Sequence, residues 1–412
     1  MLDKKADILY LIMGTNPFPN LISIATRLKK GGEIYCICTK ETKDKPFVRL
    51  KNVLSRKGVN ISTTPIEVKD TDREDIEDKI SKHLSEIVLK ASNDIVIELN
   101  YNGGTKVMSS VSYDIIKNFN YEEYAKSVQV NLTYIDPEKD VMYLEQGKGP
   151  NFNYVSNCFS LSQLDSNINL ELIDVIDAHN DISRIKFKST ELKPEMEELA
   201  RKFGNLFVDI KYEDYRKTIN FLEMVYDKAR NSKNTFLSEL NNLILQFKMP
   251  INFDGIIKAF NKDEEIVKYF EKTAWLEDYI LSVINELKQE KVIEDALANV
   301  EKSNTKEESG FEVDIVMYKK YKLYAVSVTS KDTTEKAAKK LYEISQRAKN
   351  LAGDEGYSCY INLCWETEEL IYHYKNIWDN YTPKNTLILG VQDFRNIKNK
   401  LRSWILGGGL DG

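Results

Sequence analysis

The chain of 412 residues has few of the side chains that build metal centres and disulfide frameworks. It contains five cysteines and three histidines, and only Cys36 and Cys38 lie close together in the sequence. A structural zinc site needs four Cys or His ligands at short, regular spacing, and a small secreted domain needs paired cysteines. Neither pattern occurs, so we expect a protein of the reducing cytoplasm.

Long apolar runs and an excess of positive charge are also missing. No apolar segment approaches the roughly 20 residues of a membrane-spanning helix, and the first residues lack the apolar core of a signal peptide, so no membrane partner is expected. The formal net charge is −6, which argues against a basic surface overall but is compatible with a local basic groove. This length and balance of residues predict two or three globular domains.

The common nucleotide-binding motifs, G-x-G-x-x-G and G-x-x-x-x-G-K-[ST], do not occur, which disfavours a dinucleotide cofactor or a P-loop nucleotide. Strand and helix patterns nevertheless alternate from residue 7 to about 120. We predict strands at 7–13, 33–38, 60–68 and 95–99, helices at 19–30, 44–57, 70–90 and 105–118, and a hairpin at 128–146. This alternation predicts a parallel, Rossmann-like sheet that binds ligands beyond the carboxyl ends of its strands.

Small polar residues follow three of these strands. Asn102-Gly103-Gly104-Thr105-Lys106 leads from a buried strand into a helix, where two glycines allow close approach to the backbone. The positive end of the helix dipole and Lys106 favour an anion, although a tight turn alone would also select glycines. Gly14-Thr15-Asn16 and Thr39 follow two other strands, and helix capping is the simpler alternative for Thr15 and Asn16.

This order of elements, the Gly-Thr-Asn loop and the string from Asn102 to Met108 resemble the CARF domain of CRISPR-associated ancillary proteins. The resemblance covers residues 1–155 and implies a homodimer whose two CARF domains bind one cyclic oligoadenylate, expected to be cyclic tetra-adenylate. Core packing is the alternative role for Met108. The implied ligand-binding residues are Gly14, Thr15, Asn16, Thr39, Asn102, Gly103, Gly104, Thr105, Lys106 and Met108.

The C-terminal third contains a second group of polar residues on predicted strands. A helix begins near Trp275-Leu276-Glu277, and strands are predicted at 311–316, 324–331 and 357–364 with a helix at 334–351. Side chains alternate along a strand, so Glu312 and Asp314 share one face, as do Ser327, Thr329 and Lys331. Carboxylates beside a lysine suit a hard divalent cation that activates water for attack on a phosphoryl group.

Residues 271–366 resemble the PD-(D/E)xK nuclease superfamily, in particular its CARF-linked members. The resemblance implies that Glu277, Glu312 and Asp314 bind Mg²⁺ or Mn²⁺. The chain departs from the family where Ser327 and Thr329 replace a glutamate and a lysine. Ser327 and Thr329 remain candidate catalytic residues if a hydroxyl or a water ligates the metal there, and a weakened site is the alternative. Lys331 is then the expected catalytic ammonium group, and Lys336 or Lys340 on the next helix is the alternative.

The predicted fold class is α/β, with a Rossmann-like CARF domain at 1–155, a mostly helical connecting module at 156–270 and a restriction-endonuclease-like domain at 271–412. The implied function is a cyclic-oligoadenylate-activated, metal-dependent endonuclease of low sequence specificity that cleaves DNA and/or RNA in type III CRISPR antiviral defence. One alternative is a non-catalytic sensor that binds nucleic acid or a protein partner. A further alternative is a CARF domain that cleaves its own ligand.

Overall fold

The chain forms two compact units, Met1–Arg184 with Asn350–Glu355, and Ile185–Lys349 with Gly356–Gly412, which we call unit 1 and unit 2. A computed structural model describes residues 4–59, 61, 64–91, 94–124, 127–136, 139–148, 154–305, 309–330, 334–353, 356–377 and 385–407. For residues 122, 124, 334–338 and 373–377 it describes the backbone alone. The division into units differs from the boundaries expected at 155 and 270.

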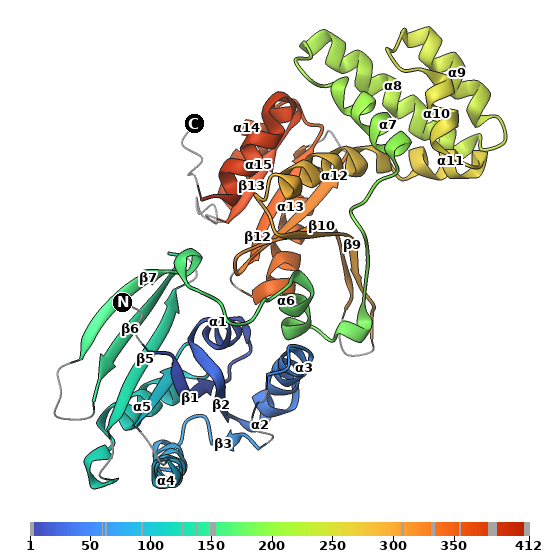
Figure 1. Cartoon of the computed structure of the whole chain (residues 1–412). Helices are drawn as coiled ribbons and strands as arrows, with labels where there is room; N and C mark the ends of the chain where they lie inside the picture. Colours follow the sequence, from blue (N-terminus) through green and yellow to red (C-terminus); the bar gives the residue numbers. More distant parts are fainter. Residues whose placement is uncertain are drawn as a thin grey trace. The chain divides into compact units, whose positions relative to one another are not determined.

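Unit 1 is built on a mixed sheet with the strand order β3-β2-β1-β4-β5-β6-β7 (Figure 1). The first five strands in this order run parallel, and β6 and β7 are added antiparallel at one edge. The predicted Rossmann-like alternation is therefore confirmed. The strands are β1 (Ala6–Ile12), β2 (Leu28–Cys38), β3 (Ile66–Glu67), β4 (Ile95–Asn100), β5 (Val128–Asp136), β6 (Val141–Gly147) and β7 (Val155–Ser160).

Helices cover both faces of this sheet. Apolar residues at helical spacing on α4, such as Ile76, Ile80 and Leu84, pack with residues of α5 against Ile8 and Tyr10 of β1. Helix α6 packs against α1 and α3. The helices are α1 (Phe18–Arg27), α2 (Lys40–Thr42), α3 (Val48–Arg56), α4 (Arg73–Lys90), α5 (Lys106–Asn118) and α6 (Leu172–His179).

Several boundaries in unit 1 differ from the sequence prediction for local physical reasons. Gly31 and Gly32 do not end a helix but lie inside β2, where the register between β1 and β2 shifts. The helix predicted at 44–57 is interrupted by a π-helical turn (Lys43–Phe47) that contains Pro46. Strand β7 falls in a segment expected to be a loop, because its side chains are largely exposed and polar at the sheet edge.

A buried ion pair lies in the middle of unit 1. Arg27 at the end of α1 and Glu98 on β4 are 1% and 0% exposed, and Arg27 donates to both carboxylate oxygens of Glu98 at 2.8–3.1 Å. Asn131 donates a further hydrogen bond to Glu98 (3.1 Å). Two buried charges with this many hydrogen bonds fix the position of α1 against the sheet, and the apolar run around Glu98 gives no sign of the pair.

Unit 2 contains a second mixed sheet with the strand order β13-β12-β11-β10-β9-β8. The predicted antiparallel pairing of β10 with β11 is present, and β11, β12 and β13 run parallel. The strands are β8 (Ile185–Lys188), β9 (Asp295–Lys302), β10 (Phe311–Lys319), β11 (Lys322–Thr329), β12 (Gly356–Asn362) and β13 (Thr386–Leu389).

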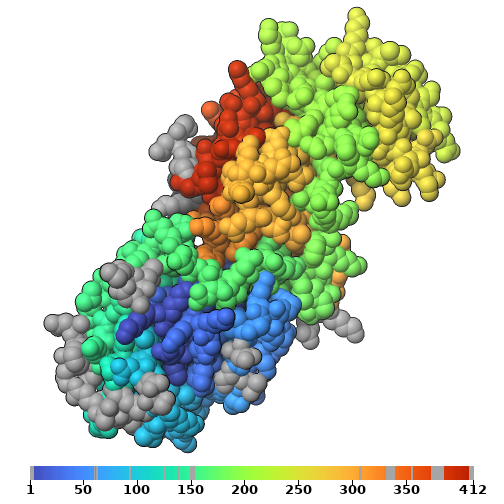
Figure 2. Space-filling model, viewed as in Figure 1, coloured from blue at the N-terminus to red at the C-terminus, as the bar shows by residue number. Residues whose placement is uncertain are grey.

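Residues 156–184 of the segment predicted as a helical module belong to unit 1, and residues 185–270 belong to unit 2. Helices α7 to α11 lie in this second part. Its helices share one continuous hydrophobic core with α12 and with one face of the sheet, and they form a continuous surface in Figure 2 (green to yellow). The helices of unit 2 are α7 (Pro194–Asn205), α8 (Tyr212–Asn231), α9 (Phe236–Phe247), α10 (Phe253–Ala259), α11 (Asp263–Glu271), α12 (Ala274–Gln289), α13 (Thr334–Ala352), α14 (Thr367–Ile377) and α15 (Ile397–Ile405). Among the residues described, no helix is long and apolar enough to span a membrane.

Candidate functional site

Two of the polar loops predicted to bind ligand meet at the carboxyl edge of the sheet in unit 1. A Cβ atom on Gly14 would lie 2.9 Å from the backbone nitrogen of Gly104, and one on Gly103 would lie 1.9 Å from the carbonyl oxygen of Ile12. Gly104 has a φ of +71°, which favours glycine. The glycines are thus required for the two loops to approach each other, a reason that the sequence analysis did not anticipate.

The loop after β4 is fixed by side-chain hydrogen bonds. Thr105 caps α5, since its hydroxyl accepts from the Met108 N–H (3.2 Å) and donates to the Asp70 carbonyl (2.7 Å). Asn102 bonds both the N–H and the carbonyl of Ile135 at 2.6 Å. The Met108 side chain is fully buried against Gly104, whereas Lys106 is exposed at the first turn of α5.

Two of the other predicted ligand residues of unit 1, Thr39 and Asn16, have local hydrogen-bond partners. Thr39 caps α2 through its hydroxyl, which accepts from the Thr42 N–H (3.2 Å), and Thr15 is exposed. Asn16 Oδ1 accepts from the Phe18 N–H (3.0 Å) and lies 2.9 Å from His179 Nε2 on α6. Burial lowers the pKa of His179 to about 4, so its imidazole is neutral at pH 7.

The carboxylates predicted for unit 2 come from a helix and a neighbouring strand. Glu277 lies on the first turn of α12, and Glu312 and Asp314 lie on β10. Glu312 is exposed and Asp314 is half-buried, while Val313 between them is fully buried, so the predicted alternation is correct. Thr273, which precedes α12, has a φ of 57°, an uncommon conformation for a β-branched residue.

Asp314 is held in place by β11. Its Oδ2 atom accepts one hydrogen bond from the Val328 N–H (2.6 Å) and one from the Ser327 hydroxyl (3.1 Å). Ser327 therefore contacts Asp314 directly. Thr329 ends β11 and is half-buried. Lys331 lies outside the described residues, as does the side chain of Lys336, and Lys340 pairs with Glu343 at 3.0 Å.

The acidic groups of this region repel one another. Burial, followed by the charges of Asp314, Asp278 and Glu312, raises the pKa of Glu277 to about 8. Burial also raises the pKa of Asp314, despite its two hydrogen bonds, and raises that of Asp278 to about 6. Lys188 on β8 acts in the opposite direction on Glu277. A cation between these groups would relieve the repulsion.

The donor set fits a hard divalent cation, because carboxylate oxygens are the ligands that Mg²⁺ and Mn²⁺ prefer. The carboxylates nevertheless do not lie close enough together to form a preformed metal site. Within the described ranges, no group of three or more His, Cys, Asp or Glu side chains is close enough to hold a metal ion.

Residues of β12 and α13 also lie near this site and were not predicted from the sequence. Ser327 pairs with Tyr360 of β12, whose hydroxyl is buried and has no hydrogen-bond partner among the residues described. Burial, followed by the charges of Cys364, Asp314 and Glu343, raises the pKa of Tyr360. The polar alternation Ser358, Tyr360, Asn362 was the available sequence signal. Arg347 on α13 is close enough to lower the pKa of Asp314.

No protein-family model matches the chain, and no curated protein matches it in sequence. Solved structures do match. Protein VC1899 from Vibrio cholerae superposes with a TM-score of 0.70 at 13% identity, over 98% of both chains. Can2 from Sulfobacillus thermosulfidooxidans, solved in complex with cyclic tetra-adenylate, superposes with a TM-score of 0.63 at 16% identity, over 97% of both chains.

This chain has the fold of VC1899 and Can2. A third structure, a type III CRISPR defence DNA nuclease activated by cyclic oligoadenylate, reaches a TM-score of only 0.48 at 13% identity, over 88% of this chain and 46% of the other, and is too dissimilar to support an inference. The likeness to VC1899 and Can2 extends over both units, so the predicted fold class and the resemblance noted in the sequence are confirmed at the level of the fold.

Proposed function

We propose that the chain is a nuclease activated by a cyclic oligoadenylate, in the setting of type III CRISPR antiviral defence in the cytoplasm. The observation that carries the proposal is its full-length likeness in fold to Can2, a protein solved with cyclic tetra-adenylate. The two glycine loops of unit 1 and the carboxylates of unit 2 supply a residue set for sensing and for cleavage on that shared fold.

In unit 1, the loops at residues 14–16 and 102–106 would bind the ligand together with Thr39. A cyclic tetranucleotide has a symmetric ring, and a two-fold homodimer would present the same loops to both halves of it. Lys106 at the positive end of α5 and the backbone N–H groups of these loops would meet its phosphates. The buried side chain of Met108 would pack against Gly104 and hold the loop in position.

In unit 2, Glu277, Glu312 and Asp314 would hold Mg²⁺ or Mn²⁺. A bound divalent cation would supply an activated water and neutralise charge on the phosphodiester. Ser327 and the Val328 N–H orient Asp314, and a lysine, Lys331 or Lys340, would stabilise the reacting phosphate. The substrate is DNA and/or RNA, cleaved with low sequence specificity.

The decisive experiment is degradation of plasmid DNA and of RNA by the full chain, with and without cyclic tetra-adenylate and Mn²⁺. We expect cleavage only when both are present, and chelation of the metal should stop it. Cleavage that is absent under all these conditions would overturn the proposed function.

Lys106→Ala is expected to raise the cyclic tetra-adenylate concentration for half-maximal cleavage roughly 100-fold. Each homodimer loses two charge-assisted hydrogen bonds, at about 1.5 kcal/mol or more each. Cleavage at saturating activator should be unchanged because the residue lies in unit 1. Lys82→Ala removes another exposed lysine of unit 1, on α4, and serves as the matched control. Equal activator responses for the two variants would contradict the assignment of Lys106.

A non-catalytic sensor is the second candidate function. It is favoured by Ser327 and Thr329, which stand where the nuclease family has charged residues, and by the loose spacing of the carboxylates. Titration with Mn²⁺, monitored by isothermal titration calorimetry, separates the two candidates. A nuclease should bind Mn²⁺ in a manner that Asp314→Asn weakens, whereas a sensor without a metal site should show no difference between the two proteins.

A further inference from the structure

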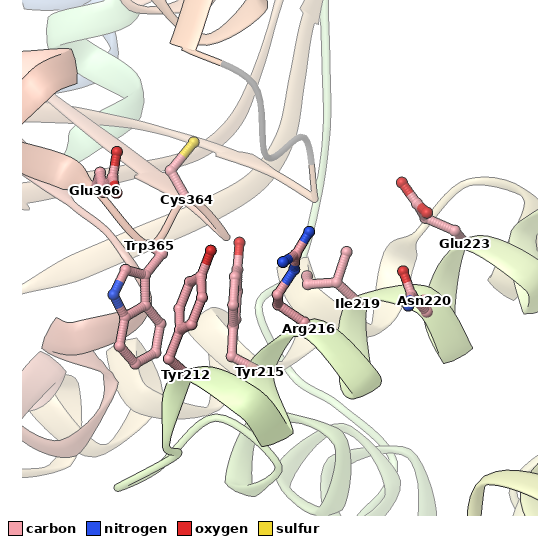
Figure 3. Close-up of a pocket in the computed structure, with 9 residues that line it drawn as sticks. All are labelled: Tyr212, Tyr215, Arg216, Ile219, Asn220, Glu223, Cys364, Trp365 and Glu366. Carbon is pink, nitrogen blue, oxygen red and sulfur yellow. The ribbon is translucent and has the colours of Figure 1, made fainter.

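A pocket of about 300 Å³ lies in unit 2 between α8 and the loop that follows β12 (Figure 3). Its volume is at the small end of the range for ligand sites. None of the residues proposed above for ligand binding or catalysis lines it. The lining residues are Tyr212, Tyr215, Arg216, Ile219, Asn220, Glu223, Cys364, Trp365 and Glu366.

Three aromatic side chains form one wall of this pocket. The ring centroid of Trp365 lies 5.1 Å from that of Tyr215 and 5.3 Å from that of Tyr212. Tyr212 and Tyr215 are nearly parallel, with an angle of 27° between their planes. Tyr212 remains 48% exposed despite these contacts. A clustered but accessible aromatic surface offers a face on which another flat ring can stack.

The wall is held rigidly. The Tyr215 hydroxyl donates to the Leu363 carbonyl (2.9 Å), which joins α8 to the loop after β12. Tyr215 is buried, and the guanidinium carbon of Arg216 lies 5.8 Å from the Tyr212 ring centroid. Figure 3 shows the rings of Tyr212 and Tyr215 side by side on α8 with Trp365 beside Tyr212. A ligand would therefore meet a preformed surface.

The polar lining suits a neutral heterocycle better than a phosphate. Arg216 and the Asn220 amide can donate hydrogen bonds, and Glu223, Glu366 and Asn220 can accept them. None of these four side chains makes a hydrogen bond or an ion pair with the residues described. Two carboxylates and one guanidinium leave the pocket with a net negative charge, which disfavours an anion. The edge of a nucleobase carries both amino donors and ring acceptors.

The pocket lies along the same strand ends as the carboxylates. Thr329 of β11 pairs with Asn362 of β12, and Cys364 follows two residues later. Helix α8 also lies near both strand ends. The Tyr215 hydroxyl donates to the Leu363 carbonyl after β12, and Ser330 after β11 is close enough to Tyr226 to lower the pKa of its hydroxyl.

The C-terminal half of α8 is also hydrogen-bonded to α12, the helix that carries Glu277. Tyr226 accepts a hydrogen bond from Trp275 Nε1 (2.8 Å), two residues before Glu277 on α12. Asn220 and Glu223 lie between Tyr215 and Tyr226 on α8. The stretch from Tyr215 to Tyr226 spans about 16 Å of helix, so the pocket is within reach of a strand whose phosphate lies at the carboxylates.

We propose that this pocket binds one nucleobase of the nucleic-acid strand being cleaved, stacked on Tyr212 and Trp365. The inference rests on the proposed nuclease function and adds a substrate class to it. A base can enter such a pocket only when it is unpaired and unstacked from its neighbours. The enzyme therefore prefers single-stranded or locally melted DNA or RNA over intact duplex.

The test uses the full-length Asp314→Asn variant, which we expect to bind substrate without cleaving it, with cyclic tetra-adenylate and Mn²⁺. Binding of labelled single-stranded DNA and RNA is measured by fluorescence anisotropy, beside duplex DNA and strands that lack bases at successive positions. Adding Tyr212→Ala should weaken binding of the base-bearing strand roughly 5- to 150-fold, the equivalent of about 1–3 kcal/mol per stacked base. Trp365→Ala should act in the same way.

The abasic strand supplies the readout that a structural defect would not imitate. The abasic strand should bind weakly to the protein with Tyr212 intact. Its affinity should not fall further in Tyr212→Ala. Tyr212→Phe keeps the ring and should retain binding. Tyr372→Ala removes an aromatic side chain on α14 that is 65% exposed and outside the pocket, and should have no effect.

The outcomes separate this inference from the proposed function. Equal binding of the base-bearing strand by the proteins with Tyr212 and with Tyr212→Ala overturns the base pocket, as does tighter binding of duplex than of single strands. Parallel cleavage assays of the wild-type chain report on the nuclease itself. If the wild type cleaves while Tyr212→Ala binds normally, the base pocket alone is wrong. If the wild type does not cleave and Asp314→Asn does not bind, both proposals fail.

Discussion

Asp314→Ala is expected to lower the activator-dependent cleavage rate by about 1,000-fold while leaving the binding of cyclic tetra-adenylate unchanged. Asp314 is one of three proposed ligands of the metal, and metal-ion catalysis supplies several kcal/mol of transition-state stabilisation, which corresponds to a loss of this size. Cleavage is measured as initial rates at saturating activator and Mn²⁺. Ligand binding is measured separately, because the affected residue lies in unit 2.

The alanine variant also leaves the Val328 N–H without its acceptor, so Asp314→Asn is the matched comparison. The asparagine oxygen can still accept that hydrogen bond, and only the negative charge is lost. Ser327→Ala should lower the cleavage rate less, by about 10- to 100-fold. It removes a hydroxyl that orients Asp314 and leaves Asp314, the proposed metal ligand, in place. Cleavage by Asp314→Asn at the wild-type rate would show that the active site lies elsewhere.

Glu98→Ala is expected to lower the free energy of unfolding of unit 1 by about 3–5 kcal/mol, because it leaves the Arg27 charge buried without a partner. Urea unfolding followed by circular dichroism measures the change. A double variant, Arg27→Met with Glu98→Leu, removes both charges and should recover most of the loss.

Glu67→Ala provides the control for this prediction. It breaks a pair with Lys43 at 2.7 Å in which the glutamate is 47% exposed, and such solvent-screened pairs contribute little to stability. If Glu98→Ala were as stable as Glu67→Ala, the Arg27–Glu98 pair would not fix α1 as we describe.

The sequence predicts the elements of unit 1 well where apolar periodicity is strong. Strands β1 and β4 and helices α4 and α5 lie close to their predicted positions, because buried strands and amphipathic helices leave clear patterns. Strand β7 leaves no such pattern, since an exposed edge strand can be polar throughout. The predicted strand at 33–38 is shorter than β2, because Gly31 and Gly32 lie inside β2 but are residues that typically end a helix.

Within the candidate sites, the sequence indicates which residues share a face but not which groups touch. Alternation along β10 is enough to place Glu312 and Asp314 together. The hydrogen bond from Ser327 to Asp314 depends on the register of two strands, and the contact of Gly103 with Ile12 depends on two loops far apart in the chain. Such contacts follow from tertiary packing, which no local pattern encodes. The roles assigned to these residues in ligand binding and catalysis stay predictions.

The path of the chain through the two units determines how the protein can be divided. The polypeptide passes between the units three times, because Asn350–Glu355 belongs to unit 1 although the residues on both sides belong to unit 2. Asn180 donates a hydrogen bond to the carbonyl of Asn350 (3.2 Å), so a fragment that ends at residue 184 loses a native partner. A protease that cuts once near residue 184 would leave both products linked through residues 350–355. Separate expression of unit 1 therefore requires this short segment to be grafted onto it or supplied as a peptide.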